Sequence, residues 1–221
     1  EAARVDKGQG VAGSLVLSLP LSFARPQLGP LFPALLAAHP HLRLELRFEE
    51  RFADLVGEGV DLAIRAGSAP PESPFVIARK LALIDRVLCA SPAFVQAHGP
   101  LKSPGDLASR PCVLQGAQTT WSFEGPKGPL LIKVAGALRA NNISALREAA
   151  LAGLGVARLP LWVVDDELRA GRLVQLLPQA RMPVIEVYGV FHAGARGSRA
   201  LRAVLDYFLA ELPRRTRMRP P

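Results

Sequence analysis

Hydrophobic and polar positions in the first third of the chain change repeatedly between the spacing of a strand and that of a helix. Strands are expected at residues 14–19, 43–48 and 60–64, and helices at residues 31–38 and 53–57. A Gly or Pro stands at or just after the end of each helix. The order strand, helix, strand, helix, strand predicts a parallel sheet that helices cover on both faces.

The same alternation continues to the end of the chain. Ser91 with Pro92, and Ser103 with Pro104, place a capping hydroxyl before a proline in the first helical position. Trp121 lies in a segment without an assigned element and is a lid, a surface residue or a core anchor. Further strands are expected at residues 86–90, 130–138, 156–159, 173–176 and 184–191, and further helices at residues 145–152, 162–170 and 198–212. These elements predict two α/β subdomains.

The composition is that of a folded globular protein. Hydrophobic residues make up 49% and charged residues 21% of the 221 positions, which argues against a disordered chain. The apolar runs contain Gly, Ser and Pro and are shorter than the roughly 20 residues of a membrane helix, so no membrane partner is expected. Cys89 and Cys112 are too few for a disulfide framework, which favours a cytoplasmic location.

Half of the net charge of +8 comes from the C-terminal end, at Arg214, Arg215, Arg217 and Arg219. No acidic residue stands among them, and residues 214–221 are expected to form a solvated basic tail. The other basic residues are neither interleaved with aromatic residues nor aligned on one helix. A DNA-binding surface is therefore not expected within these residues.

The stretch LPLSF places Ser22 where the first strand ends and a helix begins. Its hydroxyl is a helix cap, a nucleophile or part of a binding site. No G-x-S-x-G pattern surrounds Ser22 and no histidine has a recognisable link to it, so a catalytic role is disfavoured. Pro26 fits the first turn of a helix capped by Ser22. Pro30 and Pro33 either bend that helix or move its start to Gly29 and Pro30.

Six segments in a fixed order carry a family resemblance: GSLVLSLPLSF, LGPLFPALLAAHPHLRLEL, DLVGEGVDLAIRAG, VLCASPAFVQAHGPLKSPGDL, NNISALREAALAGLGVARLP and LRAGRLVQLLP. Over roughly residues 13–212, the chain resembles the effector-binding domain of LysR-type transcriptional regulators. The resemblance implies an α/β fold with two Rossmann-like subdomains joined by two crossover strands. This is the type 2 periplasmic-binding-protein fold, in which a ligand cleft lies between the lobes.

The resemblance also implies boundaries, with subdomain I at residues 13–87 and 188–213 and subdomain II at residues 88–187. The crossings are expected near residues 87–91 and 186–190. Residues 1–12 are expected to be the remnant of a linker to a missing DNA-binding domain, an N-terminal winged helix-turn-helix. The chain is further expected to form dimers or tetramers, with residues 28–38 of one protomer against the second lobe of its partner.

Ligands of open parallel α/β sheets bind beyond the carboxyl ends of the strands, where helix N-termini present free N–H groups. Ser22 follows the first strand at this position, and Asn142 and Ile143 open the strong helix at residues 145–152. Both helix starts favour a carboxylate or a phosphate. Ser22 and Asn142 are also ordinary capping residues, and that interpretation stays open.

Arg65 follows the strand at residues 60–64 and is expected at the same edge. A guanidinium there either pairs bidentately with an effector carboxylate or forms a structural bridge to Glu45, Glu49 or Asp61. The two interpretations are equally supported by the sequence.

The remaining effector-binding candidates are Phe23, Ser91, Gln115, Leu159 and Pro160. Phe23, Leu159 and Pro160 form either the apolar wall of a pocket, suited to an organic acid with a hydrocarbon or aromatic body, or part of the core. Ser91 and Gln115 lie near the first crossing and at the end of the next strand.

No pattern in the chain predicts a catalytic residue, a metal site or a cofactor. His39 and His41 form an H-x-H pair without a third or fourth ligand in view. The stretch GLGV at residues 153–156 fits a helix end that leads into a strand better than a dinucleotide-binding loop.

These expectations combine into the effector-sensing and oligomerisation domain of a LysR-type regulator. The resemblance implies that a small organic anion, expected to be a carboxylate, binds between the lobes. The binding would control how the missing N-terminal domain attaches to DNA. DNA is expected as a partner only through that domain. The alternative is a solute-binding protein or an enzyme on the same two-lobed fold. The sequence leaves open the effector, activation or repression, and the choice of homodimer or homotetramer.

Overall fold

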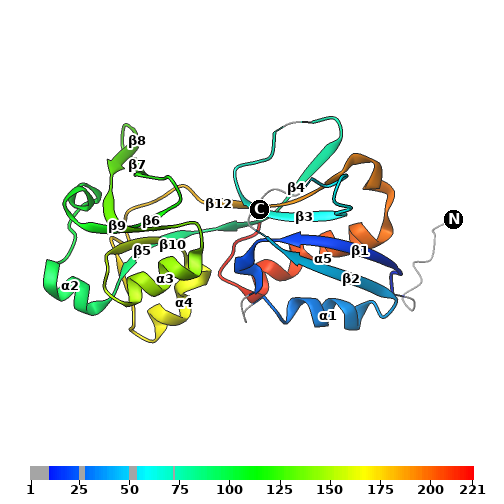
Figure 1. Cartoon of the computed structure of the whole chain (residues 1–221), viewed down its shortest axis with the longest axis horizontal. Coiled ribbons are helices and arrows are strands. Elements are labelled where there is room, and N and C mark those ends of the chain that lie inside the picture. The colour runs from blue at the N-terminus through cyan, green and yellow to red at the C-terminus, as the bar shows by residue number, and fades with distance from the viewer. Residues whose placement is uncertain (1–9, 25–27, 50–53, 72) are drawn as a thin grey trace. The chain divides into compact units, whose positions relative to one another are not determined.

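The computed structural model describes residues 10–24, 28–49, 54–71 and 73–221. The chain forms two compact units, each with its own sheet (Figure 1). Unit 1 contains the described residues up to Leu83 together with Glu186–Pro221, and unit 2 is Ile84–Ile185. The chain therefore leaves unit 1 once and returns to it once.

The sheet of unit 1 has five strands, which are, in sheet order, β2 (Leu42–Phe48), β1 (Gly13–Leu19), β3 (Leu62–Gly67), β12 (Ile185–His192) and β4 (Val76–Ile84). β1 runs parallel to both β2 and β3, whereas β12 runs antiparallel to β3. The three strands predicted at residues 14–19, 43–48 and 60–64 are thus parallel, as expected, but the complete sheet is mixed. The reason is that β12 enters this sheet on the return from unit 2, without the crossover helix that makes neighbouring strands parallel.

The helices α1 (Leu31–Ala38) and α5 (Arg199–Arg215) lie on one side of this sheet (Figure 1). Two short 3-10 helices, η1 (Leu21–Ala24) and η3 (Ala193–Gly197), complete the unit. Phe32 and Phe208 meet edge to face with ring centroids 6.1 Å apart, and the hydroxyl of Tyr207 donates to the carbonyl of Leu31 at 2.9 Å. These contacts join α1 to α5 over the buried leucines of β1.

The sheet of unit 2 also has five strands, which are, in sheet order, β11 (Val174–Leu176), β5 (Arg86–Ala90), β10 (Val156–Pro160), β6 (Pro111–Gln115) and β9 (Ala135–Ala140). β10, β6 and β9 are parallel neighbours, and β5 runs antiparallel to both β10 and β11. The helices are α2 (Pro92–His98), η2 (Pro104–Ser109), α3 (Ile143–Leu151) and α4 (Leu161–Arg169).

A hairpin of β7 (Thr120–Gly125) and β8 (Gly128–Lys133) packs on the core of unit 2. Trp121 and Phe123 of β7 are each 1% exposed and belong to the same buried cluster as Leu88 and Phe94. Of the three interpretations of Trp121, the core anchor is confirmed.

The helix predicted at residues 53–57 is wrong over its described part, and Ala53 lies outside the described residues. The side chain of Asp54 accepts hydrogen bonds from the backbone N–H groups of Val56 (3.2 Å) and Gly57 (3.1 Å), and residues 55–59 form turns. An aspartate that binds its following backbone in this way replaces the helical hydrogen bonds.

Strand β4 was not expected from the sequence, because Arg79 and Lys80 interrupt its apolar run. Both charges have partners from distant segments: Arg79 Nη1 lies 2.7 Å from Asp206 Oδ1 of α5, and Lys80 donates to Glu186 of β12. The strand predicted at residues 130–138 is in fact two strands, β8 and β9. Tertiary contacts thus determine the strand structure of both segments.

The C-terminal residues do not form the solvated tail that their charge predicted. Arg214 and Arg215 belong to α5 and pair with Glu211 at 3.2 Å and 2.7 Å. Arg219 exchanges two backbone hydrogen bonds with Leu83, at 2.8 Å and 2.7 Å. The expected linker remnant at residues 1–12 falls largely outside the described residues.

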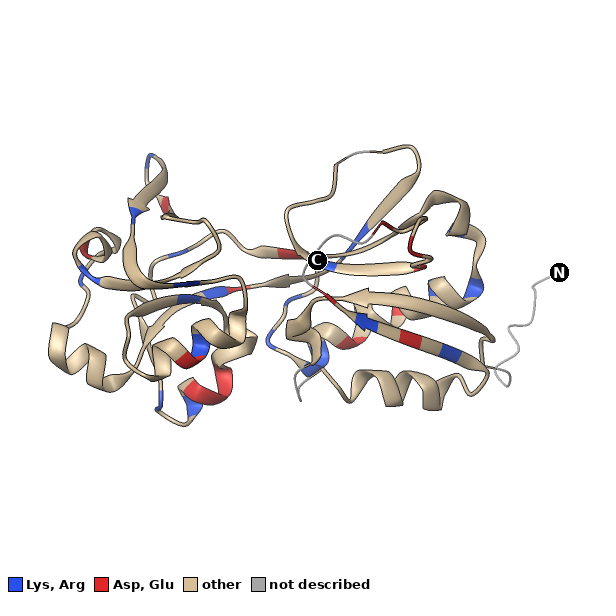
Figure 2. Ribbon diagram, in the orientation of Figure 1, with Lys and Arg blue, Asp and Glu red and all other residues tan. Residues whose placement is uncertain are grey.

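Charged residues of both signs occur along the sheets and helices of each unit (Figure 2). β2, for example, alternates Arg43, Glu45 and Arg47 along one edge of its sheet. In the described ranges, no helix combines the length and the apolar character needed to cross a membrane.

Candidate functional site

The carboxyl ends of β2, β1 and β3 meet at one edge of unit 1, because these three strands are parallel. Three polar side chains gather there. Arg65 Nη2 donates to Ser18 Oγ at 2.6 Å, and Ser18 Oγ donates in turn to Glu49 Oε1 at 2.6 Å. Arg65 Nη2 also lies 3.8 Å from Glu49 Oε1. The three residues thus form one connected network.

Arg65 is only 7% exposed, and its guanidinium is bound within its own unit. Besides Ser18 Oγ, it donates to the carbonyl oxygens of Ser18 (3.1 Å) and Ile64 (2.7 Å). Of the carboxylates considered as structural partners, Glu49 lies within ion-pair distance. This geometry favours the structural interpretation of Arg65, and its contact with an effector stays a prediction.

Ser22 does not begin a regular helix. It is the second residue of η1, and α1 begins at Leu31 with Pro30 in the capping position. The alternative start near Pro30 is therefore confirmed, and Ser22 does not cap α1. Pro26 lies outside the described residues. Phe23 is 1% exposed and belongs to the core, whereas Ser22 is half-buried.

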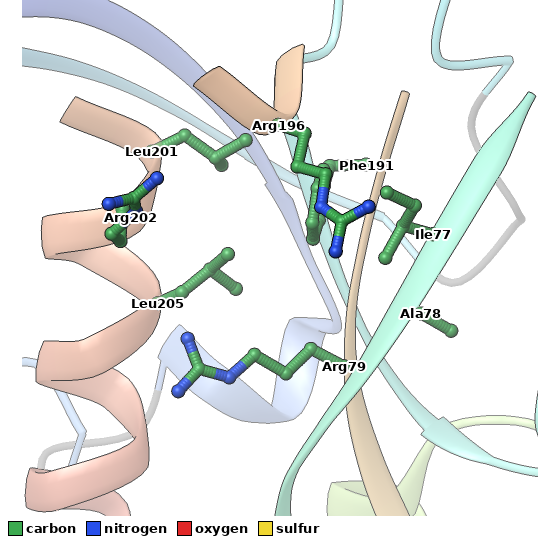
Figure 3. A pocket seen from close by; sticks show the side chains of 8 residues that line it. All are labelled: Ile77, Ala78, Arg79, Phe191, Arg196, Leu201, Arg202 and Leu205. Carbon is green, nitrogen blue, oxygen red and sulfur yellow. The ribbon is translucent and has the colours of Figure 1, made fainter. Parts of the chain in front are cut away.

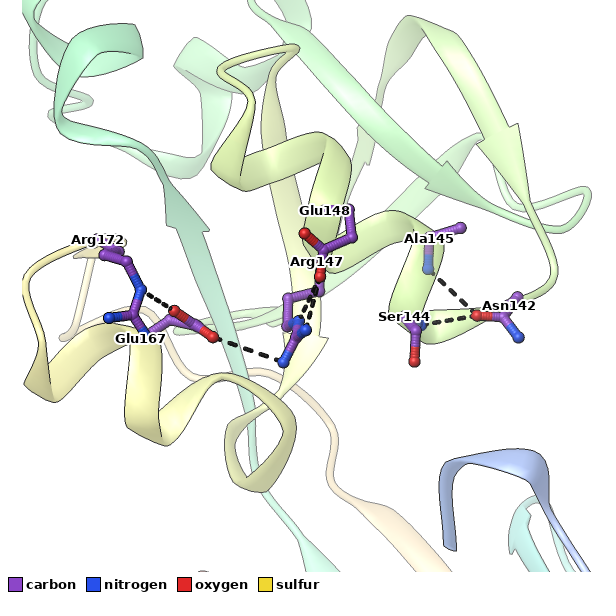
Figure 4. A network of polar contacts seen from close by, with 7 residues as sticks. All are labelled: Asn142, Ser144, Ala145, Arg147, Glu148, Glu167 and Arg172. Carbon is purple, nitrogen blue, oxygen red and sulfur yellow. Dashed lines mark hydrogen bonds and ion pairs between the residues drawn. The ribbon is translucent and has the colours of Figure 1, made fainter. Parts of the chain in front are cut away.

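The carboxyl ends of β6, β9 and β10 meet in the same way at one edge of unit 2. Gln115 ends β6, Pro160 ends β10, and Asn142 stands just after β9. Asn142 Oδ1 accepts hydrogen bonds from the backbone N–H groups of Ser144 at 2.9 Å and Ala145 at 3.1 Å (Figure 4). Asn142 is thus the N-cap of α3, as predicted.

The other candidates in unit 2 have structural surroundings. Leu159 is 1% exposed and Pro160 is buried, so both belong to the core rather than to an open wall. Ser91 is 5% exposed, and its Oγ accepts from the N–H of Phe94 at 3.2 Å as the cap of α2. Gln115 and Ile143 are half-buried. The effector contacts of these residues stay predictions.

A buried carboxylate joins α3 to α4 (Figure 4). Glu167 of α4 is 7% exposed and accepts from Arg172 Nε at 2.5 Å, while Arg147 Nη1 of α3 lies 3.5 Å from its other oxygen. The hydrogen bond to Glu167 raises the pKa of Arg172. This network links α3, the helix that Asn142 caps, to α4.

Two arginines that the sequence did not single out lie at the same edge of unit 2. β5 and β10 are antiparallel, with Arg158 opposite Leu88, so Arg86 and Arg158 are diagonal neighbours on one face of the sheet. Arg158 Nη2 donates to Gln118 Oε1 at 2.5 Å, and its guanidinium carbon lies 5.4 Å from the centroid of the Trp121 ring.

Neither Arg86 nor Arg158 forms an ion pair with another described residue. Arg86 donates instead to the carbonyl oxygen of Pro183. Burial, and then repulsion from Arg86, lowers the pKa of Arg158 to about 10. Both groups are still cationic at neutral pH. Two partly desolvated positive charges without a counter-charge form a favourable binding site for an anion.

Comparison with known proteins identifies the relatives of this chain. The model of the LysR substrate binding domain family matches residues 8–213. The chain belongs to this family. The HTH-type transcriptional regulator DmlR of Escherichia coli K12 is 35% identical over 206 residues, which cover 91% of this chain and 66% of DmlR. The chain therefore spans just under two thirds of the length of that relative.

Solved structures of LysR-type regulators have the same fold. The regulatory domain of CrgA from Neisseria meningitidis matches with a TM-score of 0.79 and 26% identity, over 91% of this chain and all of that domain. The full-length virulence activator AphB of Vibrio cholerae matches with a TM-score of 0.76 and 22% identity, over 92% of this chain and 70% of AphB. This LysR domain thus has the expected type 2 periplasmic-binding-protein fold and is the effector-binding domain of a LysR-type regulator.

The relatives of this LysR domain are named transcriptional regulators, in agreement with the expectation of a domain without catalysis. Over the residues with assigned positions, no three His, Cys, Asp or Glu side chains come together as a metal site.

We expect both cysteines of the folded domain to resist alkylation. Cys89 is fully buried and Cys112 is 1% exposed, and burial raises the pKa of each thiol to about 12. The reactive thiolate is therefore scarce at neutral pH. Mass spectrometry after treatment with iodoacetamide checks this: the native domain should stay unmodified while the urea-unfolded domain gains two adducts. Rapid modification of the native form would contradict it.

Proposed function

We propose that this LysR domain binds a small organic anion, a carboxylate, and that the bound anion controls how the full-length regulator attaches to DNA. The observation that carries the proposal is the Arg86 and Arg158 pair at the carboxyl-end edge of unit 2. An effector carboxylate would supply the counter-charge that the described residues do not provide. The N-terminal winged helix-turn-helix expected from the resemblance would carry the DNA contact.

Arginine suits this task because its planar guanidinium binds both oxygens of a carboxylate at once. The hydrogen bond from Arg158 to Gln118 and the nearby Trp121 ring hold one guanidinium in a fixed orientation. A preoriented group loses less conformational entropy on binding, which increases the affinity. The carboxylate would also shield Arg158 from Arg86, which restores the pKa of Arg158 toward its ordinary value.

The predicted effector-binding residues of both units stay part of this proposal. In unit 1 we assign Ser22 to direct contact, because it is half-buried and follows β1. Arg65 would position Ser18 and the strand ends, since its Nη1 and Nη2 groups already donate to partners within the unit. In unit 2, Gln115 and Asn142 lie at the carboxyl-end edge where ligands of such sheets bind. The binding mode between two lobes that the resemblance implies is proposed with them.

The regulation we propose is a shift between arrangements of a homodimer or homotetramer. An effector shifts such an equilibrium only by the difference between its affinities for the two arrangements. A coupling of about 1–3 kcal/mol, which is typical of regulatory domains, would change DNA affinity by about fivefold to a hundredfold.

The test begins with a thermal-shift screen of the domain against benzoate, salicylate and succinate. For a carboxylate that stabilises the domain, Arg86→Gln and Arg158→Gln should each weaken binding by about tenfold, the contribution of one charged hydrogen-bonding group. Ser22→Ala should weaken it less. Tryptophan fluorescence should report binding, because Trp121 and Trp162, the two tryptophans, both lie in unit 2.

Arg181→Gln is the matched control, because Arg181 is an exposed arginine of the same unit that lies outside the strands β5 and β10. It should bind the carboxylate with unchanged affinity. Unchanged binding by both the Arg86 and Arg158 variants would place the carboxylate elsewhere. Equal affinity for the neutral amide of the same acid would refute an anion-binding site.

A further inference from the structure

A pocket of about 520 Å³ lies within unit 1, between β4, β12, η3 and the first turns of α5 (Figure 3). This volume is in the range of small-molecule sites, roughly 300–1,000 Å³. Its inner surface is apolar: Phe191 is 6% exposed, Leu201 2% and Leu205 3%. Ile77 of β4 extends the same surface toward the opening.

Three arginines surround this apolar surface. Figure 3 shows Arg196 reaching in from η3, Arg79 extending across from β4, and Arg202 standing on α5. Arg79 is paired with Asp206, with 2.7 Å between Nη1 and Oδ1. Arg196 and Arg202 form no ion pair with any residue that the structure describes. The pocket thus has two positive charges without a counter-charge.

The start of α5 adds to this positive potential. Its first turn contains no acidic residue, and Arg199 and Arg202 stand there instead. A helix N-terminus has a partial positive charge, so arginines at this end are repelled and destabilise the helix. A negatively charged ligand at the same place would reverse the sign of that interaction.

We propose that this pocket, which we call the arginine pocket (Arg79, Arg196 and Arg202 around Phe191, Leu201 and Leu205), binds an organic anion with an aromatic or hydrocarbon body. The body covers the apolar surface and the carboxylate groups bind Arg196 and Arg202. Inorganic phosphate has the charge but no body to bury, so the chemistry of the pocket selects an amphipathic acid.

The arginine pocket is separate from the residues of the proposed effector site. Phe191 follows Val190, which pairs with Ala63 near the amino end of β3. Ser18, Arg65 and Glu49 gather instead toward the carboxyl ends of the strands of this sheet. All the residues that line the arginine pocket belong to unit 1, so it is a different site from the Arg86 and Arg158 pair in unit 2.

The experiment uses phthalate, an aromatic dicarboxylate, as the probe. Titration of the isotope-labelled domain should shift the backbone amide signals of residues 77–79 and 196–202, and calorimetry gives the affinity. The double variant Arg196→Gln/Arg202→Gln should weaken binding by about tenfold or more, because it removes both unpaired guanidiniums. Ala78→Glu should also weaken binding, because it adds a carboxylate at an exposed position that lines the pocket.

Arg199→Gln is the matched control, since Arg199 is an exposed arginine of the same helical turn that does not line the pocket. It should change the affinity by about twofold or less, the effect of a screened surface charge. The proposal would be overturned if the double variant bound phthalate with unchanged affinity. It would also be overturned if inorganic phosphate bound as tightly as phthalate and shifted the same amide signals. If only amide signals of unit 2 moved, phthalate would be assigned to the proposed effector site, and the proposal of the arginine pocket would be overturned.

Discussion

Replacing Gly136 by alanine should unfold unit 2 under conditions in which the unsubstituted domain is folded. Gly136 lies in β9 against β6, where the register of the two strands shifts between Pro111 and Val113. A Cβ atom at Gly136 would stand 1.6 Å from the carbonyl oxygen and 3.0 Å from the amide nitrogen of Cys112. Both are backbone atoms of a central strand, so relief requires breaking the ladder between β6 and β9.

The expected loss in the free energy of unfolding is about 4 kcal/mol or more, the range reached when the backbone of a core element must move. Urea denaturation followed by tryptophan fluorescence measures it, because Trp121 and Trp162 report on unit 2 alone. Gly105→Ala is the control in the same unit: a Cβ there meets Ser103 Oγ at 3.5 Å, an ordinary contact. An unchanged midpoint for Gly136→Ala would show that β6 and β9 do not pair in this register.

Arg65→Ala should lower the free energy of unfolding of unit 1 by about 3 kcal/mol, the cost of removing one partner from a buried charged network. The substitution leaves the carbonyl oxygens of Ser18 and Ile64 without their guanidinium donor, and it removes a positive charge 3.8 Å from Glu49 Oε1. Hydrogen exchange followed by mass spectrometry measures this unfolding, because peptides from unit 1 are observed separately from those of unit 2.

A second substitution separates the charge from the packing of Arg65. In the Arg65→Ala background, Glu49→Gln should cost about 1 kcal/mol less than it does with Arg65 present, because its ion pair with Arg65 is already lost. Arg43→Ala, at an exposed position of β2, is the control and should change stability by about 0.5 kcal/mol or less. If Arg65→Ala cost no more than Arg43→Ala, the network of Ser18, Glu49 and Arg65 would contribute nothing to the fold.

The elements that the sequence predicted well are those with local signals. The apolar spacing places α1 at residues 31–38 and β5 at residues 86–90, the bounds that the structure has. The caps at Ser91 and Asn142 were also predicted, because a cap depends on backbone groups two or three residues away. The turn at Asp54 is the exception, since the same local chemistry stabilises a turn and a helix start.

The elements that were missed have partners far along the chain. The sequence of β4 has a polar pattern because it contains Arg79 and Lys80. Their partners, Asp206 and Glu186, lie more than a hundred residues away along the chain. The β7 and β8 hairpin is recognisable once Trp121 is seen to be buried in the core of unit 2. Strand pairing depends on such distant contacts, which periodicity along the chain does not contain.

The sequence by itself determined the family, the helices and strands with local signals, and the two edges where ligands of such sheets bind, because these follow from neighbours along the chain. The tertiary structure alone decided which cations are neutralised. It brings Glu49 to Arg65, and it leaves Arg86 beside Arg158, and Arg196 near Arg202, without a carboxylate among the described residues. Ion pairing depends on distances of a few ångströms between residues from different strands and helices, and only the folded chain sets those distances.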